Sequence, residues 1–171
     1  MLDNVSEERL AQVHPELSRR IHQLAGMLSF NLRVVQGARS YAEQDALYAQ
    51  GRTEPGKVVT EAKGGYSMHN FALAVDVCPM LSSGPDWNAG DPQWKELLEK
   101  APLCHLSEGA EWHNAQGKAT PDNPHLYPEE SPASPSQEMR DAFAVGGLEV
   151  VWAIVFPQDN HDTVQDASAG E

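Results

Sequence analysis

Apolar residues recur every three or four positions near the start of the chain, a spacing that places them on one face of a helix. They follow Pro15, and proline is favoured in the first turn of a helix. The pattern predicts an amphipathic helix whose apolar face turns toward a core. The residues of this face are Leu17, Ile21, Leu24 and Leu28. The apolar run 32–35 then predicts a short strand, which Gly37 ends.

A capping box predicts the next helix. Ser40 and Glu43 stand three residues apart, so that the hydroxyl and the carboxylate can each accept a hydrogen bond from a free amide at the helix start. The predicted helix reaches about Gln50, where Gly51 stops it. The glycine-containing segment 52–66 shows little periodicity, and we expect a long surface loop of the kind that often carries function.

Two later helices are predicted from their first residues. Asp91 before Pro92 combines a capping residue with a first-turn proline and predicts a helix to about Lys100. Its buried stripe comprises Trp94, Leu97 and Leu98. Ser134 and Gln137 form a second capping box at the start of a C-terminal helix. The apolar residues of this helix are Met139, Phe143, Leu148 and Trp152.

The clearest strand is predicted over residues 71–77, where large apolar residues alternate with small or acidic ones. The large residues are Leu73, Val75 and Val77, and the others are Ala72, Ala74 and Asp76. One face would join the core, and the other would end in a carboxylate. Residues 109–112 and 124–127 are candidate short strands. We predict an α+β domain with a small, mostly antiparallel sheet and flanking helices.

Composition favours one globular unit. The chain has 171 residues, of which 40% are hydrophobic and 22% charged, enough for one core. We expect a single monomeric domain over residues 1–157 and a polar, flexible tail over 158–171. The formal net charge of -13 argues against nucleic acid and anionic lipid as partners.

The cysteines and the first residues indicate where the protein is made. Cys78 and Cys104 lack the spacing of a metal or redox motif and are expected to be buried free thiols. The first 30 residues contain no uninterrupted apolar region, so we expect no signal peptide and synthesis in a cytoplasm. The apolar run 150–156 is too short for membrane insertion.

Candidate metal ligands flank the predicted strand 71–77. His69 precedes Asp76 by seven positions, an odd offset that would place the two side chains on opposite faces of an unbroken strand. A bend near Asn70 would bring them together, and Ala72 and Ala74 would leave room for an ion. Taken alone, such a pair is more often structural.

His125 offers a third ligand. Pro124 stiffens the backbone before it. Two imidazoles and one carboxylate form a common catalytic zinc set, because they leave a fourth position for water. Asp122, three residues from His125, is the candidate base that takes the proton of this water and later hands one to the leaving amine. The sequence thus predicts one zinc ion held by His69, Asp76 and His125.

The segment 67–76, S-M-H-N-F-A-L-A-V-D, resembles the S-x-H and A-x-D signature of the zinc D-alanyl-D-alanine carboxypeptidase and L-alanyl-D-glutamate peptidase family, including its phage endolysins. The resemblance implies a D,D-peptidase/hedgehog-like fold and the same zinc ligands. Family members usually have glycine at the position of Ala72, and we expect the extra methyl to be tolerated while it narrows the floor of the site.

The upstream segment 37–48, G-A-R-S-Y-A-E-Q-D-A-L-Y, resembles a second element of the same family and is followed by Q-G-R-T. By analogy, Arg39 would stabilise the oxyanion or hold a substrate carboxylate. The alternative is a solvated arginine at a helix start. The resemblance also implies substrate contacts by Ser67, Gln44 and Trp112, although a lone serine before a strand is often only a turn residue.

The downstream elements G-x-E-W at 109–112 and D-x-P-H at 122–125 resemble the endolysin type. This chain lacks the glycines that tend to follow the tryptophan there, so we expect a different cleft wall. The other histidines, expected at the surface or in packing, are His14, His22, His105, His113 and His161.

The resemblance therefore implies a zinc metallopeptidase of peptidoglycan stem peptides, with cleavage of the L-alanyl-D-glutamate bond expected and D-alanyl-D-alanine carboxypeptidase or dipeptidase activity as the alternative. A phage-type enzyme of this kind could wait in the cytoplasm for release to the wall. A non-catalytic zinc module that recognises the wall is a third possibility, against which Asp122 argues. Ligation by Cys78, two residues past Asp76, would instead close the site.

Overall fold

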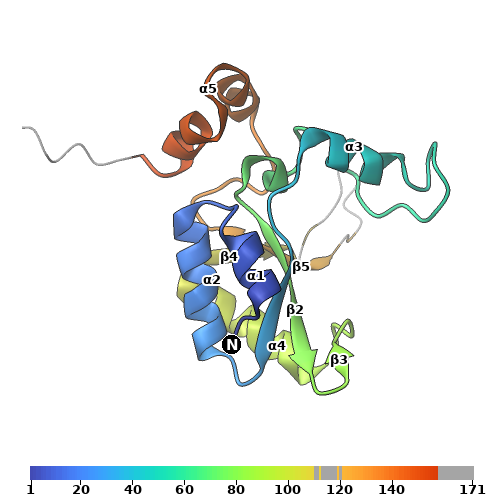
Figure 1. The fold of residues 1–171 in the computed structure, drawn as a ribbon, viewed down its shortest axis with the longest axis vertical. Helices are drawn as coiled ribbons and strands as arrows, with labels where there is room; N and C mark the ends of the chain where they lie inside the picture. Colours follow the sequence, from blue (N-terminus) through green and yellow to red (C-terminus); the bar gives the residue numbers. More distant parts are fainter. Residues whose placement is uncertain (110–111, 113–118, 120, 158–171) are drawn as a thin grey trace, which may run out of the picture.

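An antiparallel sheet forms the centre of the protein (Figure 1). The computed structural model describes residues 1–109, 112, 119 and 121–157, and in this part of the chain five strands form one sheet. Four follow the order β1-β2-β5-β4, and β3 pairs with β2. The strands are β1 (Asn31–Gln36), β2 (Val75–Leu81), β3 (Gly84–Pro85), β4 (Leu106–Gly109) and β5 (Asp122–Pro128).

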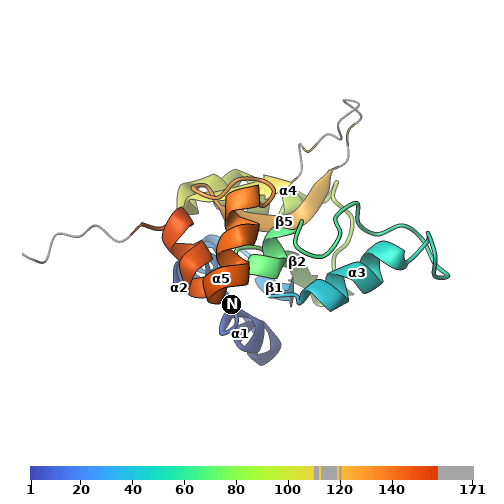
Figure 2. The ribbon, with the colours of Figure 1, turned by 90° about the horizontal axis from the view of Figure 1, so that it is seen from above.

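Helices cover this sheet and extend from one of its ends. The α-helices are α1 (Asn4–Leu10), α2 (Pro15–Met27), α3 (Tyr41–Ala49), α4 (Pro92–Lys100) and α5 (Gln137–Val155), and the 3-10 helices are η1 (Met68–Phe71) and η2 (Ala101–Cys104). Helices α1, α2 and α4 contribute to the main apolar core with β1 and β2. Helices α3 and α5 lie on either side of η1 (Figures 1 and 2). Among the described residues, no helix has the length and apolar character needed to cross a bilayer.

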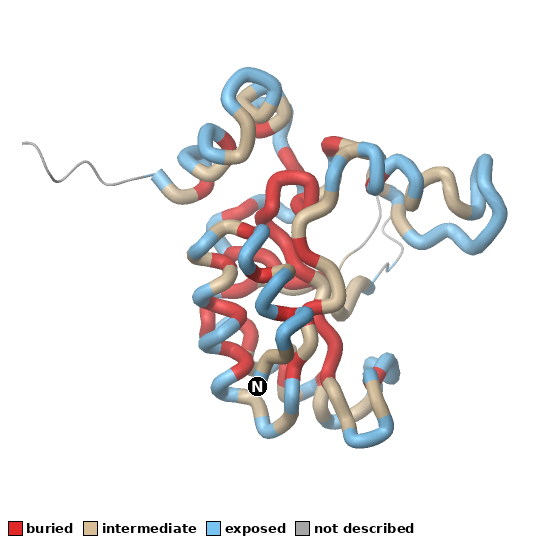
Figure 3. The backbone as a smooth tube through the Cα atoms, in the orientation of Figure 1, coloured by how far each residue is buried: buried red, intermediate tan, exposed pale blue. Residues whose placement is uncertain are grey.

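Local signals predicted several elements correctly. The apolar face of α2 is buried, β1 covers the run 32–35, and α3 begins at a capping box in which both reciprocal hydrogen bonds of Ser40 and Glu43 are present. The segment after α3 forms an exposed loop (Figure 3). Cys78 and Cys104 are free and buried. The α+β class is therefore confirmed.

The start of β2 was predicted wrongly. The strand begins at Val75 rather than at residue 71, because residues 68–71 form the 3-10 helix η1. Ala72 ends this helix in the left-handed conformation, with φ 55°, and its amide donates to the carbonyl oxygen of His69. The bend expected near Asn70 is present, whereas the alternating face of small residues is not, since Ala72 and Ala74 are both buried.

Three helix or strand starts differ from the expectation in detail. Ser136, not Ser134, caps α5 by accepting from the amide of Met139. Asp91 stands at the capping position of α4, but its carboxylate accepts from Asn88 instead of capping the helix. The strand expected at 109–112 begins earlier, as β4 at Leu106, which ends at Gly109; residues 110 and 111 lie outside the described residues. The sequence interpretation missed α1, although Asp3 caps it through the amide of Ser6.

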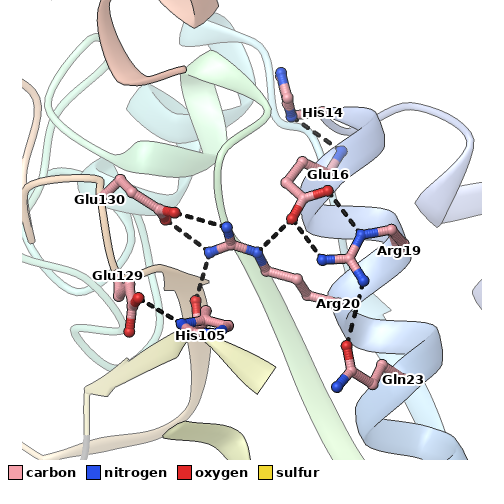
Figure 4. Close-up of polar contacts among 8 residues, drawn as sticks. All are labelled: His14, Glu16, Arg19, Arg20, Gln23, His105, Glu129 and Glu130. Carbon is pink, nitrogen blue, oxygen red and sulfur yellow. Dashed lines mark hydrogen bonds and ion pairs between the residues drawn. The ribbon is translucent and has the colours of Figure 1, made fainter. Parts of the chain in front are cut away.

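A charged network fastens α2 to the segment that follows β5 (Figure 4). The side chain of Arg20 is buried, and its guanidinium donates to both carboxylate oxygens of Glu130 at 2.6 and 2.7 Å. The same group donates to Glu16 and to the carbonyl oxygen of His105. These bonds use the whole planar fork of the guanidinium, so the network links three segments that are distant in sequence.

Candidate metal centre

His69 reaches the site from the short helix η1. The side chain of Asn70 holds this helix against the chain that leaves β1, because its amide donates to the carbonyl oxygen of Arg39 at 2.9 Å. The Asn70 side-chain oxygen accepts from the amide of Gly65. In addition, the amide of Arg39 donates to the carbonyl oxygen of His69. The turn is therefore fixed by tertiary hydrogen bonds.

Asp76 and His125 are brought together by strand pairing. They lie opposite each other in the antiparallel register of β2 and β5. Side chains of opposite residues in such a pair turn to the same face of the sheet. Oδ1 of Asp76 lies 3.2 Å from Nε2 of His69 and 3.3 Å from Nδ1 of His125. One ligand atom from each of the three residues lies within 4.8 Å of the other two.

These residues fit a divalent metal ion. Ligands of a tetrahedral zinc ion, at bond lengths of about 2.1 Å, stand about 3.4 Å apart, close to the two distances measured here. Nδ1 of His69 lies 2.8 Å from the carbonyl oxygen of Gly37, which can only accept, so this nitrogen carries a proton. The neutral ring then presents a lone pair at Nε2 to the carboxylate of Asp76. Such a contact is favourable only with a proton or a cation between the two groups.

Charge around Asp76 supports the same conclusion. Burial acts to raise the pKa of Asp76, but the two imidazoles, when no metal is bound and both rings are protonated, lower it well below its ordinary value. Nη2 of Arg39 lies 3.6 Å from the second carboxylate oxygen. Nε2 of His125 is buried without a hydrogen-bond partner among the described residues. Asp76 is therefore held as a carboxylate between cationic or protonated groups.

Asp122 lies at the start of β5 and lines the same cavity as the three candidate ligands. Burial raises the pKa of Asp122, and the neighbouring charge of Asp76 raises it further. A raised pKa makes this carboxylate a stronger proton acceptor than an exposed aspartate. Asp122 therefore stays the candidate for the general base.

A cavity of about 970 Å³ opens over these residues. Among the predicted substrate contacts, Ser67 and Trp112 line it, and the indole of Trp112 packs 4.8 Å from the ring of His125. Arg39 also lines the cavity. Gln44 does not line it, since its side chain is fully buried and bonded to Arg39 and to the loop 60–62.

The remaining cysteines and histidines lie outside the described metal cluster. The thiol of Cys78 donates to the carbonyl oxygen of Asp86, and burial raises its pKa to about 11, so the alternative of a fourth thiolate ligand is not supported. His14 packs on Trp152, while His22 and His105 contact surface glutamates. His113 and His161 lie outside the described residues.

Two features of the site were missed at the sequence level. The sequence predicts a bend near Asn70 but no role for its side chain, although its position next to His69 could have marked it as a residue that holds the turn in place. The wall formed by residues 58–62 of the long loop lines the cavity. No periodic signal identifies this wall, because tertiary contacts of α3 place it.

Several known proteins are similar to this chain in sequence or in fold. The VanY family, described as D-alanyl-D-alanine carboxypeptidase, matches residues 7–101, a range that includes Arg39, His69 and Asp76 but ends before Asp122 and His125. The peptidoglycan L-alanyl-D-glutamate endopeptidase CwlK of Bacillus subtilis (strain 168) is 34% identical over 127 residues, 68% of this chain and 73% of that protein. The L-alanyl-D-glutamate peptidase of Escherichia phage T5 is 30% identical over 120 residues, 66% of this chain and 80% of the phage protein.

A solved structure supports the fold assignment. The Serratia marcescens L-Ala D-Glu endopeptidase ChiX superposes with a TM-score of 0.52 at 20% sequence identity, covering 74% of this chain and 89% of that one. At this identity the likeness shows a shared fold, in agreement with the α+β arrangement described above.

Proposed function

Because the chain belongs to the VanY family of D-alanyl-D-alanine carboxypeptidases, we propose that it is a zinc peptidase that cleaves peptidoglycan stem peptides at the bond between L-alanine and D-glutamate. The observation that carries this proposal is the convergence of His69, Asp76 and His125 in a cavity that Asp122 also lines. The preference for this bond over D-alanyl-D-alanine rests on the names of the two sequence relatives.

In this proposal each side chain has a separate task. His69, Asp76 and His125 would hold the zinc ion, which supplies a water of lowered pKa and polarises a carbonyl group. Asp122 takes a proton from the attacking water and passes a proton to the leaving amine. The guanidinium of Arg39 lies beside Asp76 and donates hydrogen bonds to the oxyanion that develops on the scissile carbonyl.

The test is digestion of purified peptidoglycan by the zinc-loaded protein, followed by mass spectrometry of the products. New amino-terminal D-glutamate supports the endopeptidase assignment, with Asp122→Asn as the inactive control. Release of D-alanine alone would replace this assignment with the carboxypeptidase alternative. Zinc binding without any product would favour the non-catalytic recognition module.

A further inference from the structure

The wall of the cavity at residues 58–62 has no regular secondary structure, so side chains must hold it. Two neighbouring residues, Val58 and Val59, are largely exposed, and both line the cavity beside Thr60. A substrate in the cavity would contact this wall. Its position therefore affects how well substrate binds.

Arg52 fastens the outer side of this wall to α3. Its guanidinium donates to the carbonyl oxygens of Tyr48 and Thr60 at 2.8 and 2.9 Å and pairs with Glu61 at 2.7 Å. The same group stacks 4.0 Å from the ring centre of Tyr48. None of these contacts involves Arg39 or a candidate metal ligand.

Gln44 fastens the inner side of the wall and, in contrast to Arg52, also holds a residue of the metal centre. Its amide nitrogen donates to the carbonyl oxygen of Ala62 at 2.8 Å and to the hydroxyl of Thr60 at 3.3 Å. Its amide oxygen accepts from Nη1 of Arg39 at 2.7 Å. Because one end faces an acceptor and the other a donor, the orientation of this amide is determined.

The backbone of Arg39 is held by two hydrogen bonds. Its amide donates to the carbonyl oxygen of His69, and its carbonyl oxygen accepts from Asn70. The remaining freedom lies in the long side chain, whose guanidinium must be aimed at the reacting carbonyl. Gln44 holds Nη1 of this guanidinium through a neutral acceptor, whereas the carboxylate of Asp76 lies 3.6 Å from Nη2.

We propose that Gln44 is a positioning residue that joins the guanidinium of Arg39 to the substrate-contacting wall 58–62. Its catalytic consequence rests on the proposed peptidase function. Loss of the Gln44 amide releases both the wall and the guanidinium, whereas loss of the Arg52 guanidinium releases only the wall. The proposal therefore predicts different kinetic results for the two substitutions.

The kinetic test compares Gln44→Met with Arg52→Met in the zinc-loaded protein, with a soluble stem peptide as substrate. Arg52→Met should raise KM and leave kcat nearly unchanged, as expected when uniform binding is lost. Gln44→Met should raise KM and also lower kcat by roughly 10- to 100-fold, because a small displacement of a catalytic group is costly. Gln44→Glu, which keeps an acceptor for Arg39, should recover most of kcat.

A second measurement does not depend on activity. In the NMR spectrum of the zinc-loaded protein, the Nη–H signals of the Arg39 guanidinium, which donates to Gln44 through Nη1, should weaken or shift in Gln44→Met and stay unchanged in Arg52→Met. Equal effects of the two substitutions on this signal would overturn the positioning role, as would a loss of kcat in Gln44→Met that persists undiminished in an Arg39→Met background. If Gln44→Met fails to fold, Gln44→Glu decides: because it keeps an acceptor for Arg39, it should keep both the Arg39 signal and most of kcat, and loss of either in the folded variant would overturn the positioning role. A wild-type protein without peptidase activity would refute the proposed function alone, since the NMR comparison would still decide the role of Gln44.

Discussion

Asp76 and His125 lie opposite each other on β2 and β5, with Oδ1 of the first 3.3 Å from Nδ1 of the second. The strand register thus supplies two of the three candidate ligand atoms. A slip of one residue between these strands would turn one of the side chains to the other face of the sheet. The metal centre therefore depends on strand pairing as well as on residue type.

Substitution of a ligand and of the base should have separable effects. We expect His125→Ala to lose bound zinc, because only two ligands remain, and Asp122→Asn to keep zinc while its turnover falls roughly 10²- to 10⁴-fold. Zinc is measured by elemental analysis after dialysis, and turnover on peptidoglycan. His22→Ala, on the exposed face of α2, is the control and should change neither. Full zinc content in His125→Ala would contradict the ligand set.

Local sequence signals were sufficient for much of the fold. The face of α2 and the capping box of α3 are determined within a few residues, by periodicity and by first-turn hydrogen bonds. The candidate ligands were found for a similar reason, because their order along the chain resembles a family pattern. In the structure, one ligand atom from each of these three side chains lies within 4.8 Å of the other two.

Tertiary contacts determined what the sequence could not reveal. Residues 71–77 alternate well enough for a strand, yet the strand begins only at Val75, after the turn that carries His69 and that hydrogen bonds of Asn70 and Arg39 hold in place. Gln44 was expected to contact substrate, but its partners come from a loop 16 to 18 residues away in sequence. Such long-range partners leave no local pattern.

The conformation of Ala72 predicts an unusual tolerance to glycine. Its φ of 55° costs an alanine about 1–2 kcal/mol, which glycine would avoid. Loss of the buried methyl and the greater freedom of the unfolded chain offset this gain by a similar amount, about 1–2 kcal/mol. We expect Ala72→Gly to leave the free energy of unfolding within about 0.5 kcal/mol of wild type.

Ala74 provides the matched control. It is also fully buried, but its φ is not positive, so Ala74→Gly loses the methyl and gains nothing. We expect a loss of about 1–2 kcal/mol in urea unfolding. Equal losses in the two variants would show that the left-handed conformation at Ala72 carries no strain.

The network around Arg20 predicts a large difference between two adjacent arginines (Figure 4). Arg20→Met leaves the carboxylate of Glu130 without its arginine donor and removes one of the two donors to the carbonyl oxygen of His105. We expect a loss of about 2 kcal/mol, below the range for fully buried pairs because the glutamates are partly exposed. Arg19 also pairs with Glu16, but its side chain is exposed, so Arg19→Met should cost clearly less than Arg20→Met. Urea unfolding of both variants measures the difference, and a smaller loss for Arg20→Met than for Arg19→Met would contradict it.

Acid should destabilise the protein in part through Glu16. The hydrogen bond from Arg19, assisted by one from Arg20, lowers the pKa of Glu16 from 4.5 to about 2. In the unfolded chain this carboxylate takes up a proton near its ordinary pKa, so below that pH the unfolded state binds more protons than the folded state. The contribution of Glu16 to stability is therefore complete above about pH 5 and declines as the pH falls toward about 2.

Urea unfolding across this pH range measures the effect. The free energy of unfolding should fall less steeply with acid in Glu16→Gln than in wild type, because the substituted side chain does not titrate. Glu8→Gln is the control, since Glu8 lies on the surface of α1 and its carboxylate has no ion pair within the described part of the chain. The curve of Glu8→Gln should run parallel to that of wild type. Parallel curves for Glu16→Gln and wild type would instead show that the bonds of Arg19 and Arg20 do not depend on the charge of this carboxylate.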